Sequence, residues 1–154
     1  MAEICVALLT PFTTSGDVAL DALEMHTEFL IAEGVTSLMP SGTTAEGMLL
    51  DPRETVEIVR CVARVARGRA NVLAHVGRAP TRETVAVAQR VLACSVVREL
   101  AVAVLRARAG APASGAGRRD PRPHSASPSA IPAMKGELAA RLPGYPVHMR
   151  APLS

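Results

Sequence analysis

Residues 31–47, IAEGVTSLMPSGTTAEG, contain in order a helix end, a short strand and a polar loop. Gly34 is a typical C-terminal stop for the helix that the apolar spacing predicts over residues 20–33. Residues 36–39 are predicted to form a strand, and residues 41–45 the loop after it. A helix, a strand and a loop in this order are the repeating unit of an α/β fold with a parallel sheet.

The same order of elements recurs on both sides of this segment. Strands are predicted over residues 4–9, 71–76 and 100–105, and further helices over residues 52–65 and 81–94. The helix after Asp51 has the clearest start, because Asp51 suits the N-cap, Pro52 the first helical position and Glu54 the first turn. These repeated strand–helix units predict βαβ connectivity through residues 1–105.

The composition excludes several classes of function. With 154 residues, the chain is one domain in size but only half to two-thirds of a (β/α)₈ barrel, which needs about 250 residues. Aromatic residues make up 2% of the chain, so specific nucleic-acid binding by base stacking is not expected. Three cysteines without CxxC spacing indicate reduced thiols, no metal site and a cytoplasmic location. No apolar run approaches the roughly 18 residues of a membrane span, and no export signal is visible.

The character of the chain changes near residue 106. Residues 1–105 carry 9 Lys/Arg and 12 Asp/Glu, a net charge of −3, whereas residues 106–154 carry 8 and 2, a net charge of +6. Eight of the 12 prolines also follow residue 105. Residues 106–130 are therefore predicted to be disordered, and residues 131–154 to form a short helix over 133–142 followed by an extended tail.

The loop after the second predicted strand holds the candidate site. Gly42 is followed by Thr43 and Thr44, so backbone N–H groups and hydroxyls are offered together, which suits a small carboxylate. In parallel α/β folds, the loops at the carboxyl ends of the strands form the active site. The alternative is an ordinary turn whose hydroxyls bond to their own backbone.

Five segments in collinear order resemble the dihydrodipicolinate synthase and N-acetylneuraminate lyase family. They are ALLTPF at 7–12, IAEGV at 31–35, GTTAEG at 42–47, NVLAHVG at 71–77, and the helix at 81–90. The resemblance implies an α/β fold that is part of a (β/α)₈ TIM barrel. It also implies a lyase that makes or breaks carbon–carbon bonds through a lysine Schiff base with pyruvate or another 2-keto acid, with no cofactor.

The resemblance assigns roles to four residues. Thr43 would relay protons with a tyrosine, and Thr44 would bind the substrate carboxylate together with Gly42. Thr10 would stand at the end of the first strand, near the base of the pocket. Ala45 occupies a position where the family has glycine, which puts the close backbone approach there in question.

The family's Schiff-base lysine and relay tyrosine have no counterpart at the expected places. The lysine belongs on a sixth strand and the tyrosine after the fourth, whereas the only lysine here is Lys135. Residues 128–138 and 150–153 resemble the family's distant C-terminal segment, in which this lysine is not catalytic. We expect an internal deletion in a gene of this family, with or without a shifted reading frame over residues 106–127. It would join the start of the gene to its end.

Two interpretations follow from this pattern. The chain is an inactive member of the lyase family, or it is a non-catalytic half-barrel that is unfolded or self-associates through the open edge of its sheet. The arginines at 118–122 could attract phosphates, but an out-of-frame product of GC-rich DNA has the same composition, and we favour that explanation.

Three further polar residues have plain structural interpretations. His26 is expected to be a partly exposed residue of the first helix. His75, on the third strand, is expected to be packed and hydrogen-bonded rather than catalytic, with a place in the pocket as the alternative. Glu46 is expected to brace the loop by accepting backbone N–H groups rather than to act in acid–base chemistry.

Overall fold

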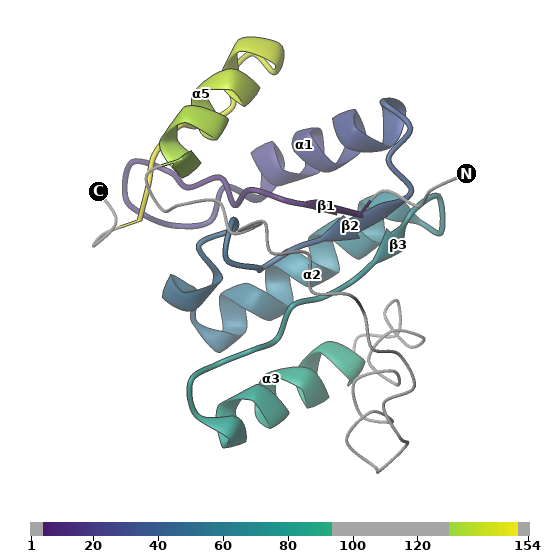
Figure 1. Cartoon of the computed structure of the whole chain (residues 1–154), viewed down its shortest axis with the longest axis vertical. Coiled ribbons are helices and arrows are strands. Elements are labelled where there is room, and N and C mark those ends of the chain that lie inside the picture. Colours follow the sequence, from purple (N-terminus) through teal and green to yellow (C-terminus); the bar gives the residue numbers. More distant parts are fainter. Residues whose placement is uncertain (1–4, 94–129, 151–154) are drawn as a thin grey trace, which may run out of the picture.

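The computed structural model describes residues 5–93 and 130–150, which form a small α/β unit (Figure 1). The elements are β1 (Cys5–Ala7), α1 (Leu20–Ala32), β2 (Ser37–Met39), the 3₁₀ turn η1 (Gly47–Leu49), α2 (Pro52–Ala66), β3 (Asn71–Val72), α3 (Thr81–Ala93) and α5 (Ile131–Arg141). The strand predicted over 100–105 and the segment predicted to be disordered, up to residue 129, lie outside the described residues. Among the described helices, none has the length and apolar character needed to cross a bilayer.

The strands form a parallel sheet in the order β1-β2-β3, with Val6, Leu38 and Val72 in register. The three described strands are shorter than predicted. β1 ends at Ala7 instead of residue 9, β2 begins at Ser37 instead of residue 36, and β3 ends at Val72 instead of residue 76. Backbone pairing nevertheless continues past the strand ends. Leu73 N donates to Leu38 O at 2.8 Å and His75 N donates to Pro40 O at 3.2 Å. Pairing therefore extends up to Pro40, directly before Ser41, whose φ of 61° turns β2 out of extended geometry.

Helix α2 starts where the sequence predicts. The Asp51 carboxylate accepts hydrogen bonds from the backbone N–H groups of Arg53 at 2.6 Å and Glu54 at 2.9 Å. The Glu54 side chain accepts in return from Asp51 N at 2.8 Å, which completes a capping box. The helix ends at Arg67, a left-handed C-cap with φ 45°. The predicted N-cap is confirmed.

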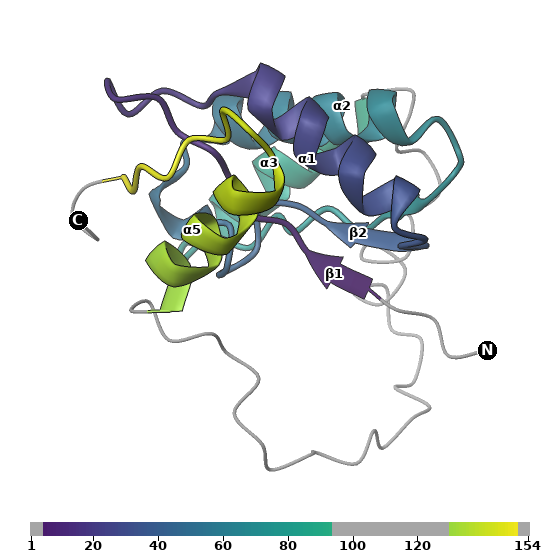
Figure 2. The same ribbon diagram turned by 90° about the horizontal axis from the view of Figure 1, so that it is seen from above.

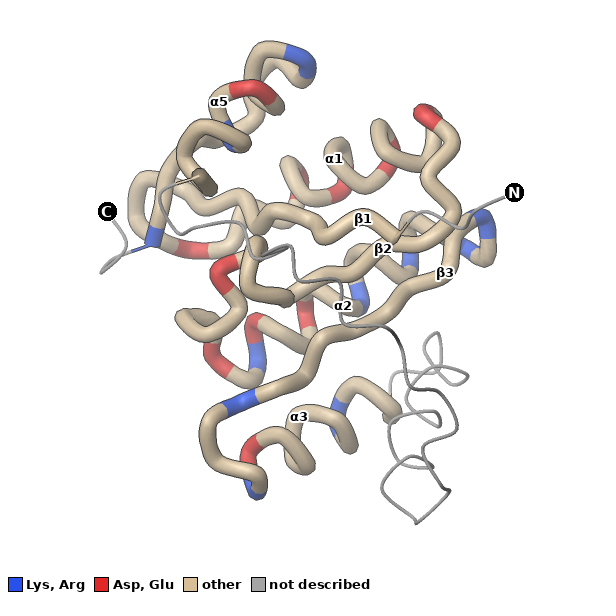
Figure 3. Tube along the Cα trace, viewed as in Figure 1, with Lys and Arg blue, Asp and Glu red and all other residues tan. Residues whose placement is uncertain are grey.

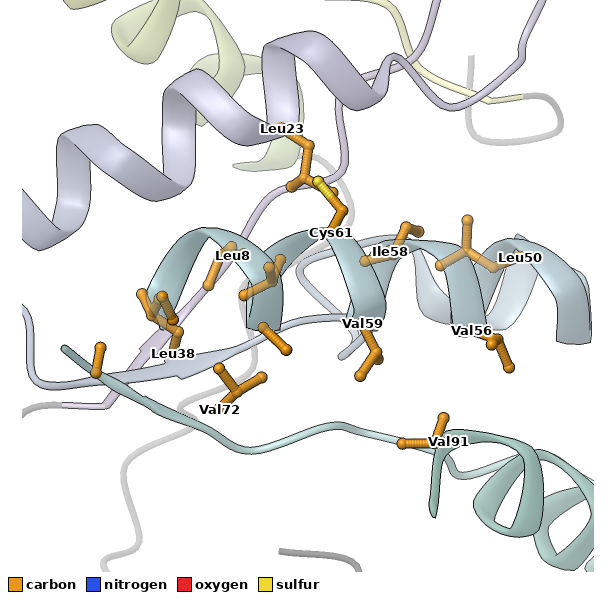
Figure 4. Close-up of a cluster of buried hydrophobic side chains, with 14 of the residues drawn as sticks. Leu8, Leu23, Leu38, Leu50, Val56, Ile58, Val59, Cys61, Val72 and Val91 are labelled. Atoms are coloured by element: carbon orange, nitrogen blue, oxygen red, sulfur yellow. The ribbon is translucent and has the colours of Figure 1, made fainter. Parts of the chain in front are cut away.

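The main core lies between the sheet and the helices α1 and α2. Figure 4 shows Leu23 of α1 and Cys61 of α2 pointing toward each other, while Leu38 and Val72 rise from the sheet toward α2. The fully buried members are aliphatic apart from one aromatic ring, Phe12. The chain therefore builds its core with few aromatic residues, because close-packed Leu, Val and Ile side chains fill this layer.

Opposite charges line the outer side of the α1–α2 contact (Figure 3). Arg64 of α2 pairs with Glu24 of α1, and Arg69, after α2, forms two hydrogen bonds of 2.8 and 2.6 Å with Glu28. These side chains are about half exposed, so solvent weakens the attraction and the pairs contribute little to stability.

The C-terminal segment, residues 130–150, packs against the start of α1 and the end of β1. Figures 1 and 2 both show α5 beside α1, on the flank of the sheet that β1 forms. A second apolar cluster joins the two parts of the chain, namely Leu9, Ala22, Ile131, Leu138 and Tyr145. Helix α5 is close to its predicted range and is integrated into the fold.

The expectation that His26 is partly exposed is wrong. Its side chain is 4% exposed, and its ring meets the edge of Tyr145 with ring centres 5.5 Å apart at 79°. Burial lowers the pKa of His26 to about 4, against a smaller raising effect of its hydrogen bond with the Leu9 backbone. The side chain that covers His26 comes from 119 positions further along the chain, so no local pattern could reveal it.

Candidate functional site

Residues 41–47 form a closed turn at the end of β2. Gly42 O accepts hydrogen bonds from Ala45 N at 3.1 Å and Gly47 N at 2.9 Å, and Glu46 N donates to the Thr43 carbonyl at 3.0 Å. A Cβ atom on Gly47 would lie 2.1 Å from Ser41 O, so only glycine fits there. The backbone of residues 41–47 therefore folds back on itself and presents residues 43 and 44 at its tip.

The residues predicted to bind substrate stand at one edge of the sheet. Thr10 follows β1 and is 1% exposed. Thr43 and Thr44 follow β2; Thr43 is exposed and Thr44 is half-buried. Because β1 and β2 are parallel, their carboxyl ends lie at the same edge. Ala45 is not among the residues with positive φ, so alanine is accepted at this position without backbone strain.

Two buried polar atoms at this edge have no hydrogen-bond partner in the described part of the chain. They are Ser41 Oγ, at the end of β2, and His75 Nδ1, shortly after β3. The His75 ring packs against Gly77, where a Cβ would stand 3.0 Å from the ring. Buried polar atoms normally have partners, so these two atoms are exceptions among the described residues.

Glu46 is fully buried, and its carboxylate is bound by the C-terminal segment. Lys135 Nζ lies 2.7 Å from Glu46 Oε1, and Arg150 N donates to Glu46 Oε2 at 3.0 Å. The side chains of Lys135 and Glu46 are both 0% exposed. The expectation that Glu46 accepts a backbone N–H is confirmed, but the donor is 104 positions away rather than in the loop.

Lys135 connects three segments of the chain. Besides Glu46, its ammonium donates to His148 O at 2.6 Å and lies 4.7 Å from the centre of the Phe12 ring. Burial lowers the pKa of Lys135, and the adjacent Glu46 carboxylate opposes this shift. The sequence contains one signal for this burial, since Ile131, Lys135 and Leu138 share the i, i+4, i+7 face of α5.

Arg150 forms a second polar anchor beside the first. Its guanidinium binds Glu54 Oε2 at 2.6 Å and the carbonyls of Gly16 at 2.6 Å and Leu49 at 3.1 Å. It also lies 4.7 Å from the centre of the Phe12 ring, which is therefore contacted by two cations. The hydrogen bond to Glu54 raises the pKa of Arg150. No pattern in the sequence predicted these contacts of Arg150.

A parallel sheet covered by its crossover helices, with hydroxyl-bearing loops at the carboxyl ends of its strands, fits part of a (β/α)₈ barrel. The model of the dihydrodipicolinate synthetase family matches residues 1–103. The chain belongs to this family. Lys135 and Arg150 lie beyond the matched residues.

Three known proteins illustrate the similarity. The 4-hydroxy-tetrahydrodipicolinate synthase of Sorangium cellulosum is 43% identical over 88 residues, which is 56% of this chain and 29% of that protein. A dihydrodipicolinate synthase from Acinetobacter baumannii, solved in complex with pyruvate, is 30% identical with a TM-score of 0.56, covering 58% of this chain and 31% of the other. Proteus mirabilis N-acetylneuraminate lyase is 26% identical with a TM-score of 0.56, covering 58% and 30%. The chain thus spans less than a third of the length of these relatives.

Proposed function

We propose that this chain binds a small 2-keto acid such as pyruvate at the turn of residues 41–47 but forms no Schiff base with it. Thr44 and Gly42 would hold the carboxylate, Thr43 would supply the hydroxyl of the family's proton relay, and Thr10 would form the floor. Family membership supports this assignment, as does the pyruvate complex of the Acinetobacter baumannii relative. Ser41, whose hydroxyl has no hydrogen-bond partner among the described residues, lies directly before Gly42 in the same turn.

The observation that carries the proposal is the state of Lys135. The family's lyase chemistry requires a neutral, accessible amine that attacks a ketone with loss of water, and the imine so formed then acts as the electron sink. Lys135 is the only lysine, its side chain is 0% exposed, and its Nζ donates to a carboxylate and a carbonyl. Both acceptors favour the protonated form of this amine, which has no lone pair for attack.

Borohydride reduction in the presence of pyruvate tests this proposal. The protein is incubated with both reagents and examined by intact mass and peptide mapping, next to a full-length relative under the same conditions. We expect an adduct on the relative and none on this chain. An adduct on Lys135 would show that the buried amine reacts and would overturn the proposal. Saturable pyruvate binding, followed by amide chemical shifts of residues 42–44, tests the carboxylate site separately.

Self-association is a second candidate property, supported by exposed apolar side chains. Leu73, directly after β3, is 38% exposed, and Met25 and Met48 are 44% and 62% exposed. Within residues 5–93 and 130–150 the sheet has three strands, whereas a closed eight-stranded barrel has no edge strands. Light scattering after size-exclusion chromatography should show oligomers at rising concentration. A monomer with one sharp unfolding transition would contradict this.

We also place the protein in the cytoplasm. Within the described residues, Cys5 and Cys61 are thiols rather than disulfides, which supports a reducing compartment. Labelling with a thiol reagent immediately after lysis should modify all three cysteines once the protein is denatured.

A further inference from the structure

The C-terminal segment reaches the loops on both sides of the proposed carboxylate site. Lys135 Nζ contacts Glu46, which stands two positions after Thr44, and Phe12, which stands two positions after Thr10. The same ammonium donates to His148 O, and Phe12 and His148 form an isolated antiparallel bridge. One buried cation therefore links the ends of β1 and β2 to the tail.

Glu46 needs this cation to occupy its position. Its φ of 56° is in the left-handed region, which a glutamate rarely adopts without support from its surroundings. Its carboxylate is also fully buried, and a buried charge is tolerated only when it is paired and hydrogen-bonded. Lys135 supplies the opposite charge, and Arg150 N satisfies the second oxygen.

The backbone of Glu46 is hydrogen-bonded directly to one of the proposed substrate-binding residues. Glu46 N donates to the carbonyl of Thr43 at 3.0 Å, and Glu46 O accepts from Leu49 N at 2.9 Å. A shift of the Glu46 side chain toward solvent would rotate its backbone out of the left-handed conformation. That rotation would move Gly47 N away from Gly42 O, which accepts its hydrogen bond at 2.9 Å, and would so open the turn that sets the direction of the hydroxyl and amide of Thr44.

We propose that Lys135 is a positioning residue: by holding Glu46 and Phe12, it sets the geometry in which Thr43, Thr44 and Thr10 meet a carboxylate. This inference rests on the proposed function, since it names what aligns the same site. The lysine touches no substrate and forms no covalent bond. It acts through Glu46, from a part of the chain that lies outside the family match at residues 1–103.

The test compares variants in the full chain by two measurements, pyruvate affinity and the amide chemical shifts of Gly42, Thr43 and Thr44. Lys135→Met removes the cation, and Glu46→Gln removes the charge that it binds while keeping an acceptor for Arg150 N. Leu138→Ala is the matched control, because it loosens the packing of α5 on the same side without touching the ion pair. Circular dichroism at the titration temperature verifies that each variant is folded.

We expect Lys135→Met to weaken pyruvate binding by about tenfold or more and to shift the amide signals of residues 42–44. Because Lys135 and Glu46 act through one contact, the variant with both substitutions should bind pyruvate no more weakly than the single variant of lower affinity. Leu138→Ala should leave both readouts near wild type. If Lys135→Met fails to fold, Glu46→Gln carries the same test from the other side of the pair.

The outcomes separate the two proposals. If the wild type binds pyruvate, and Lys135→Met binds it with the same affinity and shows the same amide signals, the positioning role is overturned and the binding function stays intact. No pyruvate binding by wild type would overturn the binding function, while a shift of the 42–44 amides in Lys135→Met alone would still support positioning. Equal losses in Lys135→Met and Leu138→Ala would mean that the lysine acts only through general stability, and would also overturn the inference.

Discussion

Residues 5–93 and residues 130–150 are held in the fold by different kinds of interaction. The first region is built around an apolar layer between sheet and helices, and its surface ion pairs are half exposed. The second region joins the first through a small apolar cluster and two polar anchors, Lys135 and Arg150, that reach buried or partly buried carboxylates. Apolar layers tolerate local change, whereas a buried charge pair depends on both partners.

The largest expected effect comes from breaking the buried pair. Lys135→Met leaves the Glu46 carboxylate buried without its cation, which should lower the free energy of unfolding by about 3–5 kcal/mol. Urea denaturation followed by circular dichroism measures it. Arg69→Gln, which removes an exposed pair in the first region, is the control and should change nothing measurable. Similar effects for the two variants would remove the distinction between the regions.

The contact between the two regions should make stability depend on pH. The pKa of His26 is about 4 in the folded protein against 6.5 for an ordinary histidine, so between these values the unfolded chain binds a proton that the folded chain does not. Stability should therefore fall as the pH is lowered from about 6.5 to 4, by up to about 1.4 kcal/mol per pH unit. Urea titrations across this range measure the slope.

The variant His26→Phe supplies the control for this pH dependence. Phenylalanine does not titrate, so the slope between pH 6.5 and 4 should become shallower. An unchanged slope would show that Tyr145 does not keep water from His26, and that the second region is less closely packed on the first than the structure indicates.

A moderate effect is expected inside the first region. Asp51→Ala removes the acceptor for the N–H groups of Arg53 and Glu54 and should cost about 1 kcal/mol of stability. Thermal unfolding measures it. Asp51→Asn keeps a capping oxygen and should retain most of the stability, so equal losses in both variants would argue against the cap.

The smallest effect is expected at the hydroxyl of Tyr145. Its Oη is buried and has no hydrogen-bond partner in the described residues, while burial raises its pKa. Removing the hydroxyl in Tyr145→Phe leaves the ring contact with His26 and should be neutral or slightly stabilising. A clear loss of stability would reveal a partner for this oxygen and add a third polar anchor to the second region.

The sequence predicted the first region well because its signals are local. Apolar spacing and the Asp51-Pro52 start located α2, and the GTTAEG motif located the turn that follows β2. The lengths of β1 and β3 were overestimated, because the apolar runs in the sequence continue beyond the last residues of these strands, Ala7 and Val72. The contacts of Lys135 were missed, because the resemblance of residues 128–138 to the family's C-terminal segment says nothing of what this lysine touches.

The order of strands and helices, the capping of α2 and the family itself could all be predicted from the sequence. Each depends on residues within one or two turns of one another, or on motifs in collinear order. Only the tertiary structure decided that His26 is buried, that Glu46 pairs with Lys135 and that Phe12 lies between two cations. These contacts join residues about 90 or more positions apart, and their energies come from excluding water, a condition that exists only after the chain has folded.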